Sequence, residues 1–369
     1  MNTTNAADFA EKTKRLREYM DENGYGAALL GRRDNVAWLT GGGDFKVLRD
    51  TEAAFGVLLV TPDTVYLVAQ SMDLDRIYDD EAAGLGIEKV SLRWYEESRE
   101  DKAVKLANVA RIVSDMPVSG ADCRLWDIYW LHYPLTQSDI AAYRQIAKTC
   151  DEMIYAVASR IEPGMTEQQI EAELIGDYVK ANFTMKVVLV GSDERISLYR
   201  HPNPSAKKLE KVALLHPAGC CHGLHVNITR MVCFGDVPAD LSDKYDLLNL
   251  LEAQTMAMMR PGTPFMELFE ERKRLLAAHD MADEWKCHYP GAVTGYILGS
   301  AQPFLSAETI RDAMSMDNFI TVKGAKVEEI SISGENGAEL ISAGHAWPTK
   351  TYSYKNKAYE LPVILERQA

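Results

Sequence analysis

Hydrophobic positions in the first third of the chain alternate between helical and strand-like spacing. Apolar residues at helical spacing predict one helix over residues 8–22, which stops at Asn23-Gly24, and another over 103–114. Between them, four short apolar runs predict strands at residues 27–31, 35–40, 55–61 and 64–70. Because alternating helices and strands are typical of α/β domains, we assign residues 1–133 to an N-terminal α/β domain.

The rest of the chain opens with a long predicted helix over residues 139–161, with Thr136 or Ser138 as its N-cap. The Gln-rich segment 167–180 and the Glu-rich segment 265–279 have the spacing of two further helices.

A weak internal repeat links these helices. RIEPGMT at 160–166 and RPGT at 260–263 each end a long helix with Pro-Gly and begin another helix with a threonine cap. Such connectors are also common in unrelated proteins, but here each copy precedes a stretch rich in strand-forming residues. We therefore expect two duplicated halves within a second domain, residues 134–369, and an α/β (α+β) protein overall.

Composition narrows the choice of partners. The 369 residues carry a formal net charge of -14, which disfavours nucleic acid and anionic membranes as partners. The charged N-terminus lacks the apolar core of a signal peptide, and no segment has the ~20 apolar residues of a membrane span, so we expect a cytoplasmic protein.

Polar residues that could form a site concentrate in the second domain. Four of the eight histidines lie between His201 and His225, and His288 lies in a Gly-rich segment. In the strand that begins near Leu224, period-two alternation places His225, Asn227, Thr229 and Met231 on one face and Arg230 on the other. One face can line a site, although a half-exposed edge strand fits the same pattern. The adjacent Glu328 and Glu329 must point to opposite faces of their strand.

These residues resemble a known superfamily: the creatinases, prolidases and aminopeptidases P. NVAWLTGG is similar to a motif of its N-terminal domain, and QSDIAAYRQIAK is similar to the first helix of its "pita-bread" catalytic domain, whose two halves are related by a pseudo-twofold axis. His201 in RHPNPSAKKLEKV resembles the substrate-side histidine, VNITR an Asp-Ile-Thr-Arg motif, His288 the ligand histidine, and Glu328 the final bridging glutamate.

The resemblance implies two divalent ions held by two Asp, one His and two Glu. At the positions of the two aspartates stand His216 and Asn227, eleven residues apart, and Asn318 or Phe319 stands near the first glutamate. Two ions about 3.5 to 4 Å apart need several carboxylates, so we do not expect a dinuclear centre.

A mononuclear site is the alternative to no metal at all. His216, His288 and Glu328 would form a two-His-one-carboxylate set with Asn227 as a weak oxygen donor, and such a set suits one manganese, iron or zinc ion.

Creatinase provides the expected chemistry, because the resemblance implies hydrolysis of a C–N bond without metal. His201 would act as acid and base, and Glu328 would stabilise the imidazolium or a cationic substrate group. His216, Asn227, Thr229 and His288 would bind polar atoms of the substrate. Thr229 lies near the position of a creatinase glutamate, which argues against creatine itself.

We therefore expect a metal-independent or mononuclear hydrolase or lyase that acts on a C–N bond of a small, amino-acid-like molecule. One alternative is a dinuclear Xaa-Pro aminopeptidase or dipeptidase, and another is an inactive member that binds peptides or proteins. The resemblance also implies a homodimer in which Arg49 or Asp50 reaches into the site of the other subunit.

Overall fold

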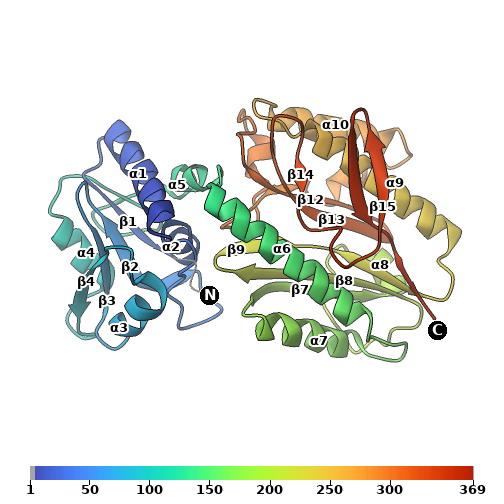
Figure 1. The fold of residues 1–369 in the computed structure, drawn as a ribbon, viewed down its shortest axis with the longest axis horizontal. Helices are drawn as coiled ribbons and strands as arrows, with labels where there is room; N and C mark the ends of the chain where they lie inside the picture. Colours follow the sequence, from blue (N-terminus) through green and yellow to red (C-terminus); the bar gives the residue numbers. More distant parts are fainter. Residues whose placement is uncertain (1–4, 369) are drawn as a thin grey trace. The chain divides into compact units, whose positions relative to one another are not determined.

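The computed structural model describes residues 5–368, which divide into two units by their contacts (Figure 1). One unit contains the residues up to Asp139 together with His222–Leu224, and the other contains Ile140–Cys221 and the residues from His225 onward. The boundary expected between residues 133 and 134 stays a prediction.

A six-stranded mixed sheet forms the centre of the first unit. Its strand order is β4 (Glu88–Leu92), β3 (Val65–Gln70), β2 (Ala53–Val60), β1 (Ala27–Arg32), β5 (Ile112–Ser114) and β6 (Asp122–Cys123). The helices are α1 (Ala6–Asn23), α2 (Arg33–Thr40), α3 (Leu74–Ile77), the π-helix Tyr78–Ala82, α4 (Arg99–Ala107) and α5 (Leu125–His132). The predicted helix 8–22 and the strands at 27–31, 55–61 and 64–70 are confirmed.

Two predictions for this unit were wrong. Residues 35–40, predicted as a strand, lie in helix α2, which ends at Gly41 in the left-handed region with φ 73°. Val36 to Leu39 are all buried, so the apolar run shows no period that could separate a helix from a strand. The helix predicted over 103–114 stops at Ala107, because Asn108 adopts φ 46°, and the chain continues as strand β5 beside β1.

The second unit contains two sheets between helices, one mixed, because β17 pairs parallel with β10, and one antiparallel. One sheet has the order β17 (Leu365–Arg367), β10 (Arg230–Phe234), β8 (Val212–Cys221) and β7 (Thr184–Ser192), and β9 (Leu224–Asn227) also pairs with β8. The other has the order β11 (Ala292–Val293), β12 (Ser315–Val322), β13 (Ala325–Ile332) and β14 (Glu339–Leu340). A bridge between Thr229 and Glu328 joins the two sheets.

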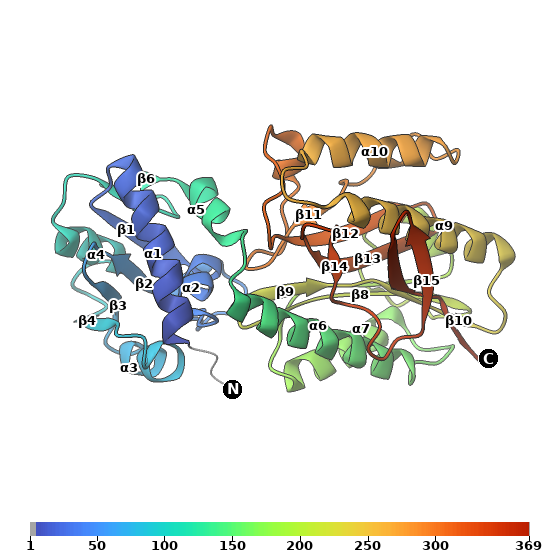
Figure 2. The same ribbon diagram turned by 45° about the horizontal axis from the view of Figure 1, so that its top comes forward.

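Helices lie on opposite sides of these strands. α7 (Glu167–Lys180) lies beside β7, and α9 (Ala239–Met258) and α10 (Phe265–Ala277) lie on the other side (Figure 2). The remaining elements are α6 (Gln137–Ala158), α8 (Glu194–Leu198), the 3₁₀ turns Glu284–Lys286 and Gln302–Leu305, and the hairpin of β15 (Thr349–Tyr354) and β16 (Lys357–Pro362).

Matching hydrogen bonds support the internal repeat. After α6, the Gly164 N–H donates to the Leu209 carbonyl at 2.8 Å, and after α9 the Gly262 N–H donates to the Ile310 carbonyl, also at 2.8 Å. Each Pro-Gly turn thus precedes a helix, α7 or α10, and bonds to a segment about 45 residues downstream. The two halves therefore share their connections as well as their order of helices and strands.

The predicted helix caps were half right. Thr136, not Ser138, caps α6, because its Oγ1 accepts from the Asp139 N–H at 3.1 Å. Thr166 forms a capping box with Gln169 at the start of α7. Thr263 does not cap α10: the N-cap residue is Pro264, which has no side-chain acceptor.

Candidate active site

Three strands of the second unit bring His216, Thr229 and Glu328 together. His216 lies on β8, Thr229 lies between β9 and β10, and Glu328 lies on β13. Glu328 Oε2 lies 2.6 Å from His216 Nδ1 and accepts the Thr229 hydroxyl at 2.6 Å. All three side chains are buried. One carboxylate oxygen of β13 thus contacts side chains of the other sheet where the two sheets meet.

A lysine absent from our sequence-based site completes this cluster. Lys326 Nζ lies 2.8 Å from Glu328 Oε2 and 3.4 Å from His216 Nδ1, with only 3% of the lysine side chain and 4% of the glutamate side chain exposed. Lys326 precedes Glu328 by two residues on β13, so the alternation that places Glu328 in the site also places Lys326 there.

His201 and His288 form a second part of the site. Their Nε2 atoms lie 3.0 Å apart, so one of the two nitrogens carries a proton that the other accepts. His201 is exposed and His288 is partly buried, with its ring edge-on to the Phe319 ring at a centroid distance of 4.9 Å. Phe319 lies directly opposite Glu328 in the β12–β13 pair, which links the histidines to the glutamate cluster.

Two arginines hold the loops that carry these histidines. Arg200 donates to the Thr321 carbonyl of β12 at 2.9 Å and forms an ion pair with Glu284, which fixes the loop next to His201. Arg272 of α10 donates at 2.6 Å to the carbonyls of both Pro290 and Phe319, which ties the loop after His288 to β12. The two histidines thus meet through contacts to one strand, β12.

A third group consists of Asn227 and Asp317. Asn227 Nδ2 donates to Asp317 Oδ2 at 2.8 Å and to the Leu298 carbonyl at 2.9 Å. Within the described residues, Asn227 Oδ1 and Asp317 Oδ1 are buried and have no hydrogen-bond partner. Asp317 shares its face of β12 with Phe319, two residues along. This pair therefore presents two unused oxygens on the site's face of the sheet.

The opposite face of β13 carries a different ion network. Arg230 pairs with Glu329 at 2.5 Å and with Asp151 at 2.9 Å, and it also donates to the Ser342 carbonyl at 2.9 Å. The predicted placement of Glu328 and Glu329 on opposite faces is what the structure shows. The Arg230 side chain lies on the opposite face from those of Asn227 and Thr229, where it also donates to the Thr229 carbonyl at 3.0 Å, and it supports the fold.

Burial and charge set the protonation of the site. Burial lowers the pKa of His216 against the attraction of Glu328, so His216 is neutral and its Nδ1–H donates to the carboxylate. Burial alone would raise the pKa of Glu328, but the hydrogen bond from His216 and the positive charge of Lys326 hold it well below its usual range. The cluster therefore contains one negative and one positive charge, on Glu328 and Lys326.

The neighbouring groups are neutral. Burial, followed by the positive charge of Lys326, lowers the pKa of His201 and lowers that of His288 to about 4. Burial raises the pKa of Asp317 well above its usual range, and the negative charge of Glu328 adds to this effect. At neutral pH both imidazoles can accept a proton, and the Asp317 carboxyl group can donate one.

The residues present do not fit the metal centre that the resemblance implies. At the five ligand positions stand His216, Asn227, His288, Phe319 and Glu328, which include one carboxylate. Glu328 Oε2 already has three donors, and His288 contacts His201 instead of His216 or Glu328. In the part of the chain from residue 5 to residue 368, no group of three or more His, Cys, Asp or Glu side chains is arranged to hold a metal ion.

Sequence analysis found part of this arrangement and missed part of it. The structure brings together His216, Thr229 and Glu328, and separately His201 with His288. It does not join His216, His288 and Glu328 into one ligand set. Lys326 and Asp317 were missed, although each lies two residues from a candidate position on its strand.

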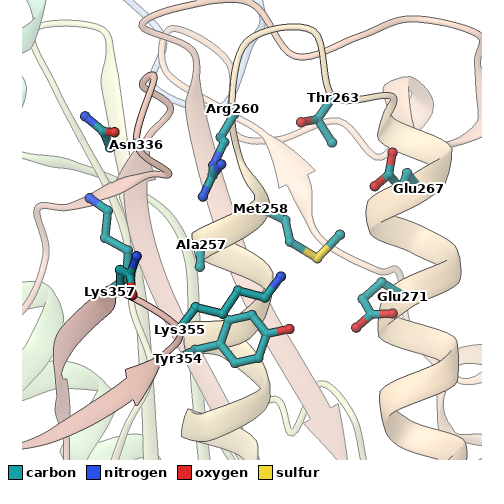
Figure 3. A pocket seen from close by; sticks show the side chains of 11 residues that line it. Ala257, Met258, Arg260, Thr263, Glu267, Glu271, Asn336, Tyr354, Lys355 and Lys357 are labelled. Atoms are coloured by element: carbon teal, nitrogen blue, oxygen red, sulfur yellow. The ribbon is translucent and has the colours of Figure 1, made fainter.

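A large surface pocket of about 750 Å³ lies elsewhere in the second unit (Figure 3). Glu267 and Glu271 of α10 line it, together with Arg260, Lys355 and Lys357. None of the histidines or site carboxylates described above contributes to its lining. Its lining includes charged side chains but no histidine, so the histidine cluster stays our candidate site.

Comparison with known proteins agrees with the fold and the resemblance. Metallopeptidase family M24 matches residues 141–338, and the creatinase/prolidase N-terminal domain matches residues 12–116. A comparison with curated protein sequences gave no match.

Solved structures share the whole fold. Dipeptidase PepE from Mycobacterium ulcerans has a TM-score of 0.76 and 17% identity, covering 98% of this chain and 99% of that one. An Xaa-Pro dipeptidase from Bacillus anthracis has a TM-score of 0.73 and 17% identity, covering 97% and 100%. The prolidase from Pyrococcus horikoshii OT3 has a TM-score of 0.74 and 16% identity, covering 90% and 98%.

The fold and the matched domains define a pita-bread hydrolase of the creatinase and Xaa-Pro peptidase superfamily, as predicted. The chain belongs to metallopeptidase family M24. Within residues 5–368, no helix combines the length and the apolar character that a membrane span requires. The expected homodimer and the roles of Arg49 and Asp50, which are exposed, stay predictions.

Proposed function

We propose that the protein hydrolyses or eliminates at a C–N bond of a small, amino-acid-like molecule, with His201 as acid and base. The observation that carries this proposal is the contact of His201 Nε2 with His288 Nε2 at 3.0 Å, beside a buried Lys326–Glu328 ion pair. A neutral imidazole pair of this kind can take up and return a proton near neutral pH.

The hydrolytic step follows from this geometry. His201 accepts a proton from water as the oxygen bonds to the substrate carbon, and it returns the proton to the nitrogen as the C–N bond breaks. His288 contacts His201 and shares its proton, so it orients the imidazole. The negative charge of Glu328 raises the pKa of His201, which partly offsets the effects that lower it and favours the protonated imidazole.

Polar groups around the histidines indicate the substrate class. Asn227 Oδ1 is an unused acceptor, and the protonated Asp317 carboxyl group is an unused donor beside it. An amide or amidine-like group offers both complements. The Lys326 ammonium supplies N–H donors for a carboxylate or carbonyl oxygen of the same molecule. His216 and Thr229 hold Glu328 in place. This positioning role is in addition to the substrate contacts that we predict for them.

A substrate screen with matched histidine variants tests the proposal. N-acyl and amidino amino acids and Xaa-Pro dipeptides are assayed with the wild type, His201→Ala and His279→Ala, whose histidine is exposed and lies outside the site. We expect turnover that persists in the presence of a chelator. His201→Ala should lose roughly 10²- to 10⁴-fold of this turnover, and His279→Ala should lose none of it. Unchanged turnover in a folded His201→Ala would contradict the proposal, and no turnover of any substrate would favour a binding protein.

Family membership favours a second candidate, a metal-dependent Xaa-Pro dipeptidase or aminopeptidase. The solved structures with the same fold include an Xaa-Pro dipeptidase. This activity would require carboxylates beyond Glu328 to balance two metal ions. Turnover of Xaa-Pro dipeptides that is abolished by chelator and restored by Mn²⁺ would establish it and exclude our first candidate.

A further inference from the structure

The charge of the candidate site differs from that of a metal centre in one specific way. Lys326 introduces a positive charge at the place where the retained Glu328 would bind a cation. Its Nζ lies 2.8 Å from Glu328 Oε2, and both side chains are almost completely buried. Because a buried charge is stable only when it is paired, the position of Lys326 depends on Glu328, and that of Glu328 on Lys326.

The ion pair leaves no negative charge for a divalent cation. Of the five ligand positions, only Glu328 carries a carboxylate, and Lys326 neutralises it. Asp317 is buried and accepts a hydrogen bond from Asn227. On β12, Phe319 lies between Asp317 and Thr321, the residue that pairs with Lys326. A divalent ion at Glu328 would have to displace the ammonium, and the two positive charges would then repel each other across a buried site.

The hydrogen bonds lead to the same result. Glu328 Oε2 accepts the Thr229 hydroxyl at 2.6 Å and lies 2.6 Å from His216 Nδ1, in addition to its contact with Lys326. His216 Nδ1 therefore points its proton at the carboxylate and has no lone pair for a metal. Two of the candidate donor atoms are thus already used by the protein itself.

We propose that the Lys326 ammonium replaces the metal ions of this fold as the cation of the site and excludes divalent metal from Glu328. Like the metal ions, the ammonium places a positive charge against the final glutamate, but here a side chain supplies that charge. This inference concerns the charge of the site and does not rest on the proposed reaction.

Calorimetric titration with Mn²⁺ and with Zn²⁺ tests this inference without a substrate. The wild type is compared with Lys326→Met, which removes the charge, and with Lys326→Arg, which keeps it. Lys323→Met is the matched control, because Lys323 is exposed and lies three residues away in the same hairpin. We expect no binding at Glu328 in the wild type, Lys326→Arg or Lys323→Met, and an affinity gain of at least roughly tenfold in Lys326→Met.

Two results would overturn the proposal. The first is binding of an ion by the wild type that is lost in Glu328→Gln. The second is a folded Lys326→Met that binds metal no better than the wild type. If Lys326→Met fails to fold, Lys326→Gln removes the same charge with a polar side chain, and the wild-type titration still decides the first point. Loss of turnover in His201→Ala would be unaffected by either result, so the two proposals fail separately.

Discussion

The two faces of strand β13 carry similar residues with different degrees of hydrogen-bond satisfaction. Glu329, on one face, lies between Arg230 and the Ser342 hydroxyl, and Arg230 also pairs with Asp151. Glu328, on the other face, contacts Lys326, His216 and the Thr229 hydroxyl. Each face thus has a buried glutamate, a buried cation and a hydroxyl donor.

The difference lies in what surrounds each pair. Asp151 Oδ2 accepts three backbone N–H groups, from residues 345 to 347, so the anions of the Arg230 network are well bonded, although Arg230 Nε has no partner within the described residues. Beside Lys326, Asn227 Oδ1 and Asp317 Oδ1 have no partner within the described residues, and His201 is exposed. Fully buried ion networks with well-bonded anions stabilise a fold, whereas unused acceptor and donor oxygens beside an exposed imidazole are typical of a binding site.

Arg230→Met gives the largest expected effect. It leaves Glu329 and Asp151 buried without their cation, and we expect the free energy of unfolding to fall by about 3 to 5 kcal/mol. Lys326→Met leaves Glu328 with the Thr229 and His216 donors, so we expect a loss of about 1 to 3 kcal/mol. Urea denaturation measures both. Equal losses of unfolding free energy in the two variants would contradict the difference between the two faces.

Replacing an aspartate on each face sharpens the comparison. Asp151→Asn removes an ionic partner of Arg230 and places an N–H₂ group among backbone donors, so we expect a loss of about 2 to 3 kcal/mol. Asp317→Asn replaces a carboxyl group that burial keeps protonated, so we expect a change below about 1 kcal/mol. The same denaturation experiment tests the pair, and a larger loss for Asp317→Asn would contradict its neutral state.

His288, on the histidine face, contributes to the pH dependence of stability. His288 has a pKa of about 4 in the folded protein, below its ordinary value of 6.5, because it is buried and lies near Lys326. Between these values the unfolded chain binds a proton that the folded chain does not, so the free energy of unfolding falls as the pH is lowered from about 6.5 to about 4.

His288→Asn removes this proton uptake, and we expect a smaller loss of stability over the same pH range. Thermal unfolding at a series of pH values measures the slope. An unchanged slope in the variant would show that His288 titrates normally in the folded protein.

The two hydroxyl donors give small and similar expected effects. Thr229→Val and Ser342→Ala each remove one hydrogen bond to a buried glutamate, Glu328 or Glu329, and we expect each to cost about 1 kcal/mol. Because Lys326 and His216 also contact Glu328, the Thr229 change should not exceed the Ser342 change. A clearly larger loss for Thr229→Val would mean that Lys326 contributes little to holding Glu328.

Alternation along strands predicted the division between Glu328 and Glu329, because period two is fixed by strand geometry. The same rule places Lys326 and Asp317 on the site's face, because each lies two residues from a candidate position on its strand. Periodicity cannot predict the contact of His201 with His288, since their loops are held by long-range bonds from Arg200 and Arg272 to β12. Helix α2 was missed because a run of buried residues carries no period.

Metal content of the protein, purified without added metal or chelator, tests the central claim most directly. Elemental analysis measures the ions per chain, and anomalous scattering from a crystal locates any that are present. The replacement of the metal by Lys326 predicts substoichiometric metal and no anomalous peak beside Glu328. One or two ions per chain bound at Glu328, with Lys326 displaced, would contradict the account and favour a metal-dependent peptidase.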